Sequence, residues 1–308
     1  MRSIRDVPPV MLISNHRAGS VSARTKEVIT KALQADFKLE AVDTESRDHA
    51  TQLAEDAVDR GFEAVLVFGG DGTVNEAAQG VVATNVALGI LPGGSTNVMA
   101  RSLGIPRDPV EATAYVAQRL RSGSYRRVGV GRVNARYFLF SGGMGLDAEV
   151  VRRVEADPER KRKSGEWSFV LNALNAGFTE YRRAEPEITV EVDGQEPYRS
   201  LLSICCNARP FTYFKRFAVD VCPAASLDKR LDVFGLDRIT TMTIPRVVGA
   251  VFVTRNHVNW KHGHYHSDVP GVSWRAARPM PVQVDGDYIG EWDRAAVRYV
   301  DDAVSLLA

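Results

Sequence analysis

The stretch VFGGDGTVNE, Val67–Glu76, decides the fold class of this chain. It continues an apolar run that starts at residue 63 and lacks polar alternation, and it leads into the helically spaced segment 73–82. Such a run predicts a strand that is buried on both faces, as in a parallel sheet covered by helices. Ligands bind at the carboxyl ends of the strands in these sheets, so the polar residues after this strand are a candidate site.

The alternation of strand and helix extends over the first 120 residues. Asp108 and Pro109 open the last of these helices as cap and first residue, and Gly61 closes an earlier one. The alternation predicts a doubly wound α/β domain. Strands are expected at 10–15, 39–43, 63–70 and 86–92, and helices at 22–35, 47–61, 73–82, 95–104 and 108–123.

The pattern changes near residue 125. Two strands around a turn at Asn134 precede two helical segments, 146–157 and 166–178. Short strands separated by turn residues follow, interrupted by one helical segment at 244–256, and this pattern predicts an antiparallel sandwich or barrel. We place the domains at residues 1–128 and 129–293. Strands are expected at 187–194, 199–207, 217–223, 231–237, 271–277, 280–287 and 296–300.

Composition excludes several classes of protein. The chain has 308 residues, 44% of them hydrophobic, which suffices for two domains, and a formal net charge of +1 that gives no reason to expect nucleic acid as a partner. We expect no secretory signal and no transmembrane span, because the longest apolar runs are far shorter than about 20 residues. The cysteines Cys205, Cys206 and Cys222 are expected to be reduced and buried in strands of a cytoplasmic protein.

Two glycine-rich loops carry the chemistry. In GGDG the glycines let backbone N–H groups approach phosphate oxygens, and a helix N-terminus follows. Asp71 would repel a bare phosphate, so we expect Mg²⁺ between them. The second loop, LPGGSTNVMAR at 91–101, repeats the arrangement about 23 residues later. A capped strand-to-helix turn is the structural alternative for each loop, and no Walker motif is present.

The combination of these loops resembles the diacylglycerol kinase catalytic domain, in the soluble bacterial lipid kinase branch related to sphingosine and ceramide kinases. Other segments fall in the family's order across nearly the whole chain. They are NHRAG at 15–19, TESRDHA at 44–50, SGGMGLDAEVV at 141–151 and VDGD at 284–287. The resemblance implies a nucleotide domain of the NAD kinase and diacylglycerol kinase type, a C-terminal β-sandwich, an active site in the cleft between them, and last strands, about 294–308, that return to the first domain.

The resemblance also implies the site residues and the cofactors, ATP and Mg²⁺. Asp71 would organise the Mg²⁺ of bound ATP, and Asp287 would be the general base for the lipid hydroxyl. The residues expected to line the ATP site are Asn15, Gly19, Thr44, Gly69, Gly70, Gly72, Thr73, Asn75, Gly94, Ser95, Thr96 and Asn97.

Three departures from the family pattern stand out. Asp287 occupies a position where relatives usually have Glu, so its carboxylate reaches less far. In SLDKRLDV, Lys229 and Arg230 stand where the family has an Asp-Gly metal turn, with Asp228 as a substitute ligand, and we expect the ammonium of Lys229 to replace the ion. The stretch 207–217, NARPFTYFKRF, replaces a glycine-rich turn.

Two further segments have both a functional and a structural interpretation. The basic cluster 160–163 fits transient contact with an anionic membrane, or a solvated loop. The stripe of Trp167, Leu171, Leu174 and Phe178 after it fits core packing better than a lipid pocket. His262, His264 and His266 would share one face of a strand, which favours a surface or cleft-lining strand over a metal site.

The sequence leaves three functional hypotheses. The first is an ATP-dependent kinase of diacylglycerol or a related lipid alcohol, cytoplasmic or peripheral at the inner face of the membrane, with a homodimer left open. The second is a NAD kinase-like enzyme, which the second loop and NHRAG disfavour. The third is a nucleotide- or lipid-binding regulator without catalysis, which the departures at Asp287 and Lys229 keep open.

Overall fold

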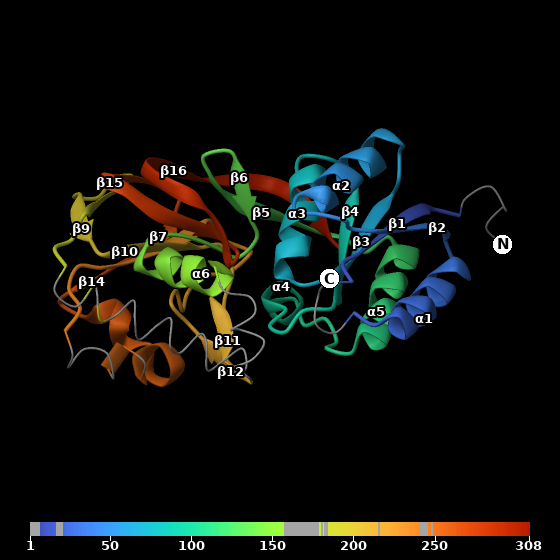
Figure 1. Cartoon of the computed structure of the whole chain (residues 1–308), viewed down its shortest axis with the longest axis horizontal. Coiled ribbons are helices and arrows are strands. Elements are labelled where there is room, and N and C mark those ends of the chain that lie inside the picture. Colours follow the sequence, from blue (N-terminus) through green and yellow to red (C-terminus); the bar gives the residue numbers. More distant parts are fainter. Residues whose placement is uncertain are drawn as a thin grey trace. The chain divides into compact units, whose positions relative to one another are not determined.

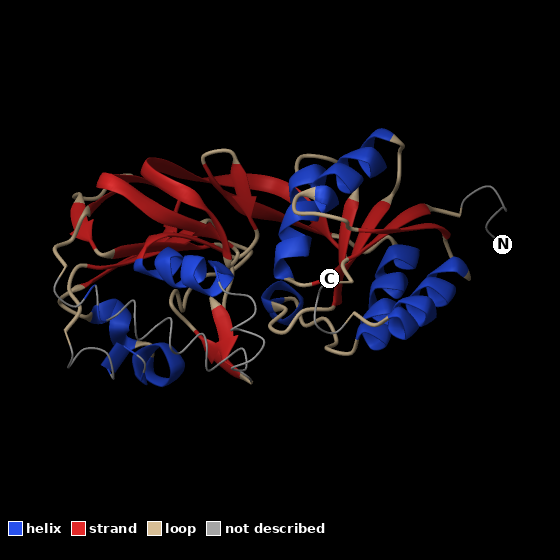
Figure 2. Cartoon of the chain, in the orientation of Figure 1, coloured by secondary structure: helices blue, strands red, loops and turns tan. Residues whose placement is uncertain are grey.

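The computed structural model describes residues 7–16, 21–156, 179, 181, 184–214, 216–240, 246–247 and 249–308. The chain divides into two compact units. One consists of Met1–Gly129 together with Asp301–Ala308, and the other of Val130–Val300. Figure 1 labels the elements, and Figure 2 shows that helices and parallel strands build the first unit and that strands dominate the second.

The first unit is a parallel sheet with the strand order β4-β3-β1-β2. Its central strands are buried along their whole length, as their continuous apolar sequences predict. Helices cover both faces (Figure 2), so the doubly wound α/β architecture is confirmed. The elements are β1 (Pro9–Ser14), α1 (Ala23–Gln34), β2 (Lys38–Asp43), α2 (His49–Asp59), β3 (Ala64–Gly69), α3 (Asp71–Val81), β4 (Ala87–Pro92), α4 (Val98–Ser102) and α5 (Pro109–Ser122).

The C-terminus of the chain is built into this sheet. The end of the last strand pairs in parallel with β4, with Ser305 opposite Ala87 and Leu306 opposite Leu88. Leu306 and Leu307 are fully buried there. The last residues therefore contribute to the core of the unit that contains the glycine loops.

The second unit is antiparallel, as the short strands predicted. Its main strand order is β14-β13-β10-β7-β15-β16, with β8 beside β15. One buried cluster centres on Trp274, and a second forms around Leu146. The elements are β5 (Arg126–Val133), β6 (Arg136–Phe138), β7 (Ser141–Gly145), α6 (Leu146–Ala156), β8 (Ile188–Val192), β9 (Tyr198–Ser200), β10 (Leu202–Cys206), β11 (Thr212–Phe214), β12 (Phe217–Val219), β13 (Leu231–Leu236), β14 (Gly263–Val269), β15 (Gly271–Val284) and β16 (Asp287–Leu306).

Two sequence expectations change here, and a third is not tested. The three cysteines are free and buried, but only Cys205 and Cys206 lie in a strand, β10, while Cys222 lies in a turn after β12. The helical segment expected at 244–256 is helical where it is described, but it ends as a π-helix, η1 (Ala250–Thr254), which a 3-10 turn, η2 (Asn256–Asn259), follows. The helix expected at 166–178 lies outside the described residues. No helix in the described part of the chain is both long enough and apolar enough to span a membrane.

We predict that Leu306→Ala lowers the free energy of unfolding by about 2–5 kcal/mol, because the fully buried side chain leaves a cavity beside β4. The measurement is denaturant unfolding, with the exposed Asp301→Ala as the matched control, which should change stability by less than about 0.5 kcal/mol. Equal stabilities of the two variants would mean that the C-terminal strand is dispensable for the first unit.

Candidate functional site

The first glycine loop joins the end of β3 to the start of α3. Gly69 is the last residue of β3, and Gly70, with extended backbone angles, caps α3 at Asp71. A helix N-terminus leaves its first N–H groups without intrahelical acceptors, and it carries a partial positive charge. The loop therefore presents the kind of backbone donors that bind phosphate oxygens.

The second glycine loop packs directly against the first. The N–H of Gly93 donates to the carbonyl of Gly69 at 2.8 Å. A Cβ added to Gly94 would lie 2.7 Å from the Cα of Gly70, so only glycine allows this approach. The carboxyl ends of β3 and β4 thus form one continuous surface, as expected when adjacent parallel strands end at the same edge of a sheet.

Asp71 links the two loops through the start of α4. Its Oδ2 accepts the N–H of Val98 at 2.9 Å, and its Oδ1 accepts the N–H of Met99 at 3.1 Å. Burial raises the pKa of Asp71, while these two N–H groups and the charge of Arg101 act in the opposite direction. Asp71 therefore caps a helix, as the structural alternative for this loop expects, but that helix is the neighbouring α4 and not α3, to which Asp71 belongs.

The second loop is closed by its own asparagine. Asn97 has a left-handed backbone, with φ of 47°; its Oδ1 accepts the N–H of Gly94 at 2.9 Å, and its Nδ2 donates to the carbonyl of Gly94 at 2.7 Å. These bonds commit the Gly94 N–H and the Asn97 amide to the loop itself. Of the neighbours proposed for the nucleotide site, Ser95 is exposed and Thr96 is half-buried.

Other predicted nucleotide residues surround the first loop. Asn15, after β1, donates from Nδ2 to the hydroxyl of Thr73 at 2.9 Å. Thr44, after β2, is buried, and its N–H donates to the carbonyl of Ser14. Asn75 is fully buried in α3 and accepts a hydrogen bond from the amide of Gln79, one turn later in the same helix. Gly19 lies outside the described residues.

A cavity of about 430 Å³ adjoins these residues at the ends of β1 and β2. It is lined from α1 by Lys26 and others, from the end of β1 by His16, and from the end of β2 by Asp43, with which Lys26 forms an ion pair at 2.7 Å. Val21, which also lines the cavity, lies beside the second loop, because a Cβ on Gly93 would contact its side chain. Val21 therefore connects one wall of the cavity with the second glycine loop.

In the second unit, the turn 284–287 separates two carboxylates with different surroundings. Asp285 and Gly286 both have positive φ, 48° and 84°, as a two-residue hairpin turn with a primed geometry requires. Asp285 is 4% exposed, and its two oxygens accept the N–H groups of Leu139, Phe140 and Ser141 at 2.7–2.9 Å. Asp287, at the start of β16, is only half-buried.

A chain of hydrogen bonds fixes the turn that carries Asp287. Gln283, fully buried in β15, accepts the N–H of Gly286 at 3.0 Å and donates to Asp147 at 3.1 Å. The N–H of Tyr288 donates to Glu155 of α6 at 2.8 Å. The position of Asp287 is therefore set from β15 and from α6.

Sequence reasoning missed Asp147 in this cluster, and it considered Asp285 only as an alternative base. Asp147 begins α6, where burial raises its pKa to about 6, against the lowering effect of the Gln283 amide and nearby N–H groups. A Cβ on Gly143 would lie 1.9 Å from an oxygen of Asp147, so the SGGMGLD segment needs its glycine to accept this carboxylate. The other missed feature is the threefold acceptor role of Asp285, for which the acid–glycine turn was the available signal.

The residues of the predicted metal turn, 228–230, form polar contacts with neighbouring protein groups. Asp228 contacts the hydroxyl of Ser226 at 3.5 Å, and the Lys229 ammonium donates to the carbonyl of Ala224 at 3.5 Å. Arg230 pairs with Asp268 at 3.2 Å. Among the described residues, no group of three or more His, Cys, Asp or Glu side chains is arranged to hold a metal ion. The replacement of an ion by Lys229 stays a prediction.

The histidines form a partly exposed cluster around an acid. His262 and His264 contact the two oxygens of Asp237 at 2.8 and 3.3 Å. Tyr198 stacks on His264, with ring centroids 4.1 Å apart, and on His266. Burial and the neighbouring His264 lower the pKa of His266. Hydrogen bonds to Asp237 and stacking on Tyr198 thus account for the positions of these histidine side chains.

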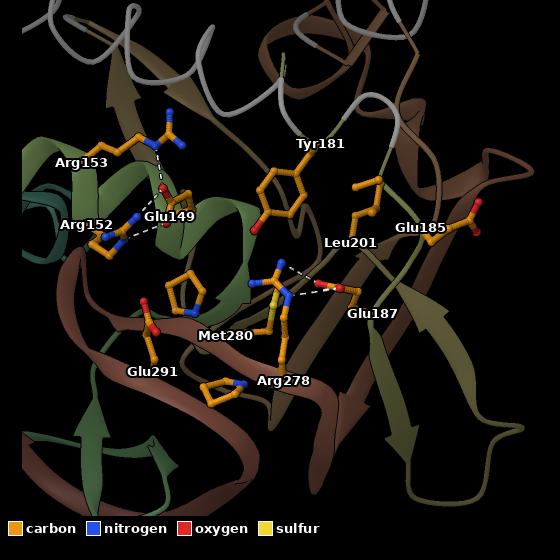
Figure 3. A pocket seen from close by; sticks show the side chains of 13 residues that line it. Glu149, Arg152, Arg153, Tyr181, Glu185, Glu187, Leu201, Arg278, Met280 and Glu291 are labelled. Carbon is orange, nitrogen blue, oxygen red and sulfur yellow. Dashed lines mark hydrogen bonds and ion pairs between the residues drawn. The ribbon is translucent and has the colours of Figure 1, made fainter.

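A second cavity, of about 290 Å³, lies between α6 and β15 (Figure 3). Glu149 accepts ion pairs from Arg152 and Arg153 at 2.8 and 2.6 Å, and Arg278 pairs with Glu187 at 2.8 Å. Burial pushes the pKa of Glu149 up, but the two arginines outweigh it and hold that pKa below its usual range. None of the predicted site residues lines this cavity, so it is separate from the glycine-loop surface.

Comparison with known proteins finds a family that matches part of this chain. Residues 9–133 match the family described as the diacylglycerol kinase catalytic domain. The diacylglycerol kinase of Bacillus subtilis (strain 168) is 28% identical over 268 residues, which cover 86% of this chain and 84% of that protein. The diacylglycerol kinase of Staphylococcus carnosus (strain TM300) is 24% identical over 269 residues, which cover 86% of this chain and 83% of that protein.

A solved structure agrees with the fold. The crystal structure of a diacylglycerol kinase from Bacillus anthracis str. Sterne matches with a TM-score of 0.73 at 22% identity, over 97% of this chain and 96% of that one. At this identity the likeness concerns the fold alone. The matched segment 9–133 contains both glycine loops and Asp71, so this part of the chain is similar to the diacylglycerol kinase catalytic domain, and the two relatives named above are diacylglycerol kinases.

Proposed function

We propose that this protein is an ATP- and Mg²⁺-dependent kinase that phosphorylates the hydroxyl of diacylglycerol or of a related lipid alcohol. The observation that carries the proposal is the contact between the two glycine loops at the start of α3. A Cβ at Gly94 would lie 2.7 Å from the Cα of Gly70, and a Cβ at Gly93 would lie 3.0 Å from the N of Gly69, so the contact requires glycine at these two positions. Phosphoryl transfer depends mainly on positioning and charge neutralisation, for which such a rigid backbone surface is suited.

The loops fit a nucleotide in their chemistry. The N–H groups of Asp71, Gly72 and Thr73 belong to the first turn of α3, where an anion is stabilised. The cavity of about 430 Å³ beside them is in the size range of small-molecule sites and would hold the nucleoside part. When bound, ATP supplies the phosphoryl group and Mg²⁺ offsets its charge. In our proposal Asp71 holds that ion through the lone pairs that α4 leaves available.

Asp287 is the proposed general base, and Asp285 the residue that supports its turn. A base must accept a proton, and a half-buried carboxylate can meet a substrate hydroxyl. Asp285 is buried under three N–H donors and is committed to the backbone. The structure therefore supports Asp287 over its neighbour for this role.

The proposed setting follows from the substrate class. A lipid alcohol is presented at a membrane, so we propose a cytoplasmic protein in transient contact with the inner, anionic leaflet. A homodimer remains compatible with this proposal. The basic cluster 160–163 and the apolar stripe of Trp167, Leu171, Leu174 and Phe178 lie outside the described residues, so membrane contact through that cluster stays a prediction from sequence.

The experiment that tests the proposal is an assay with labelled ATP against a panel of lipid alcohols and NAD. We expect label in a phosphorylated lipid, and loss of that product on chelation of Mg²⁺. Phosphorylated NAD without labelled lipid would support the NAD kinase-like alternative. Nucleotide binding without any labelled product would support the non-catalytic regulator.

The role of Asp71 is tested by Asp71→Asn. We expect turnover to fall by at least about 10²-fold, and affinity for ATP to fall only when Mg²⁺ is present, because the variant loses the charge that holds the ion. Binding of ATP in the presence of a chelator serves as the matched control.

A purely structural role for Asp71 gives a different result. Loss of a cap costs about 0.5–2 kcal/mol of stability, so thermal unfolding of the variant shows the contribution to α4. If Asp71→Asn lost stability but kept the Mg²⁺ dependence of ATP affinity, the proposed ion contact would be wrong.

The two aspartates of the 284–287 turn are separated by paired substitutions. Asp287→Asn should lower turnover by about 10²–10⁴-fold with little change in stability or ATP affinity, because it removes a general base. Asp287→Glu should retain activity. Asp285→Asn should instead lower the unfolding temperature, because an amide cannot accept all three buried N–H groups. Full activity of Asp287→Asn would show that the base lies elsewhere.

A further inference from the structure

The second unit exposes two large hydrophobic side chains in one corner. Phe217, in β12, is 53% exposed, and Val253, in η1, is 76% exposed. In the described part of this unit they are the exposed large hydrophobic residues, although 36 positions separate them in the sequence. Figure 1 shows β11 and β12 at the margin of the unit. They form a two-stranded sheet of their own, separate from the main sheet.

Specific contacts hold the two segments together. The rings of Phe214 and Phe252 meet edge to face, with centroids 6.0 Å apart. The N–H of Asp220, just after β12, donates to the carbonyl of Val251 in η1 at 2.9 Å. Phe217 and Val253 therefore belong to one structured corner, which we call the hairpin corner, made of β11, β12 and η1.

Cationic side chains accompany the apolar ones. Arg216 is exposed at the hairpin end, with its guanidinium 5.2 Å from the centre of the Phe217 ring. Arg255, also exposed, follows η1 and pairs at 2.7 Å with Asp220, whose side chain is 5% exposed. The acid of this corner is thus covered, while the arginines face solvent.

We propose that the hairpin corner is a docking surface for an anionic lipid bilayer. Aromatic and aliphatic side chains enter the boundary between headgroups and acyl chains, and basic side chains beside them contact anionic headgroups. The corner combines both kinds of group at the margin of the unit. This deepens the proposed function, on which it rests for the expectation of membrane contact, by assigning that contact to Arg216, Phe217, Val253 and Arg255.

A second copy of the chain fits the hairpin corner less well than a lipid bilayer does. A stable protein interface buries about 800 Å² on each partner. An aromatic side chain supplies roughly 150–250 Å², so one Phe and one Val fall well short of that area. The flanking arginines would also repel their counterparts across a twofold axis.

Vesicle co-sedimentation without ATP and without diacylglycerol tests the proposal independently of catalysis. The probes are vesicles of phosphatidylcholine alone and of phosphatidylcholine mixed with phosphatidylglycerol. We expect the wild-type chain to bind the mixed vesicles more tightly, with weaker binding at high salt. Arg216→Glu should weaken this binding at least about fivefold, the equivalent of one lost basic contact, and Phe217→Ser and Val253→Ser should weaken it further when combined.

Matched controls come from the first unit. Val110 is 42% exposed on α5, and Arg107 is exposed just before that helix. Val110→Ser and Arg107→Glu should leave vesicle binding unchanged. Because all these side chains are exposed, each variant should keep the wild-type unfolding temperature, which verifies that it is folded.

Three results would overturn the proposal. In the first, the hairpin-corner variants bind vesicles as tightly as the wild-type chain, and in the second, the control variants lose as much vesicle binding as the hairpin-corner variants. In the third, Phe217→Ser has a smaller mass than the wild-type chain in light scattering but keeps its vesicle binding, which would make the corner an interface between copies. Failure of the kinase proposal has a different signature, since vesicle binding through the corner would persist in a protein that transfers no phosphate.

Discussion

The carboxylate of Asp71 is the contact on which the candidate nucleotide site depends. It begins α3 and accepts the first N–H groups of α4, 27 and 28 residues away along the chain. This fixes the start of one helix to the start of the other. The glycines between them then approach to distances that no side chain allows. Burial of the charge is costly, which the raised pKa of Asp71 records, and the helix N–H groups offset part of that cost.

The second unit uses an aspartate in a related way. The carboxylate of Asp285 accepts three backbone N–H groups from residues 139–141. These bonds hold the turn that places Asp287 at the start of β16. Gln283 and Glu155 hold the same turn from β15 and from α6. In both units, a buried carboxylate orders a turn so that nearby polar groups keep a defined position, which is how a rigid site is supported.

The fold followed from the sequence where local patterns were strong. The uninterrupted apolar strands β3 and β4 predicted a buried parallel sheet, and the short strands after Pro186 predicted antiparallel pairing. Contacts between distant segments could not be predicted in this way. Nothing in local spacing reveals that Asp71 caps α4, whose first residues lie 27 and 28 positions further along the chain. The contact of η1 with β12 is likewise between segments far apart in the sequence.

The central claim is that the paired glycine loops bind the phosphates of ATP. A crystal structure of the protein with Mg²⁺ and a non-hydrolysable ATP analogue tests it most directly. The account predicts phosphate oxygens in hydrogen-bond contact with the N–H groups of Asp71, Gly72 and Thr73, and Mg²⁺ on the Asp71 side. A nucleotide bound away from the start of α3, or with Asp71 far from the ion, would contradict the account.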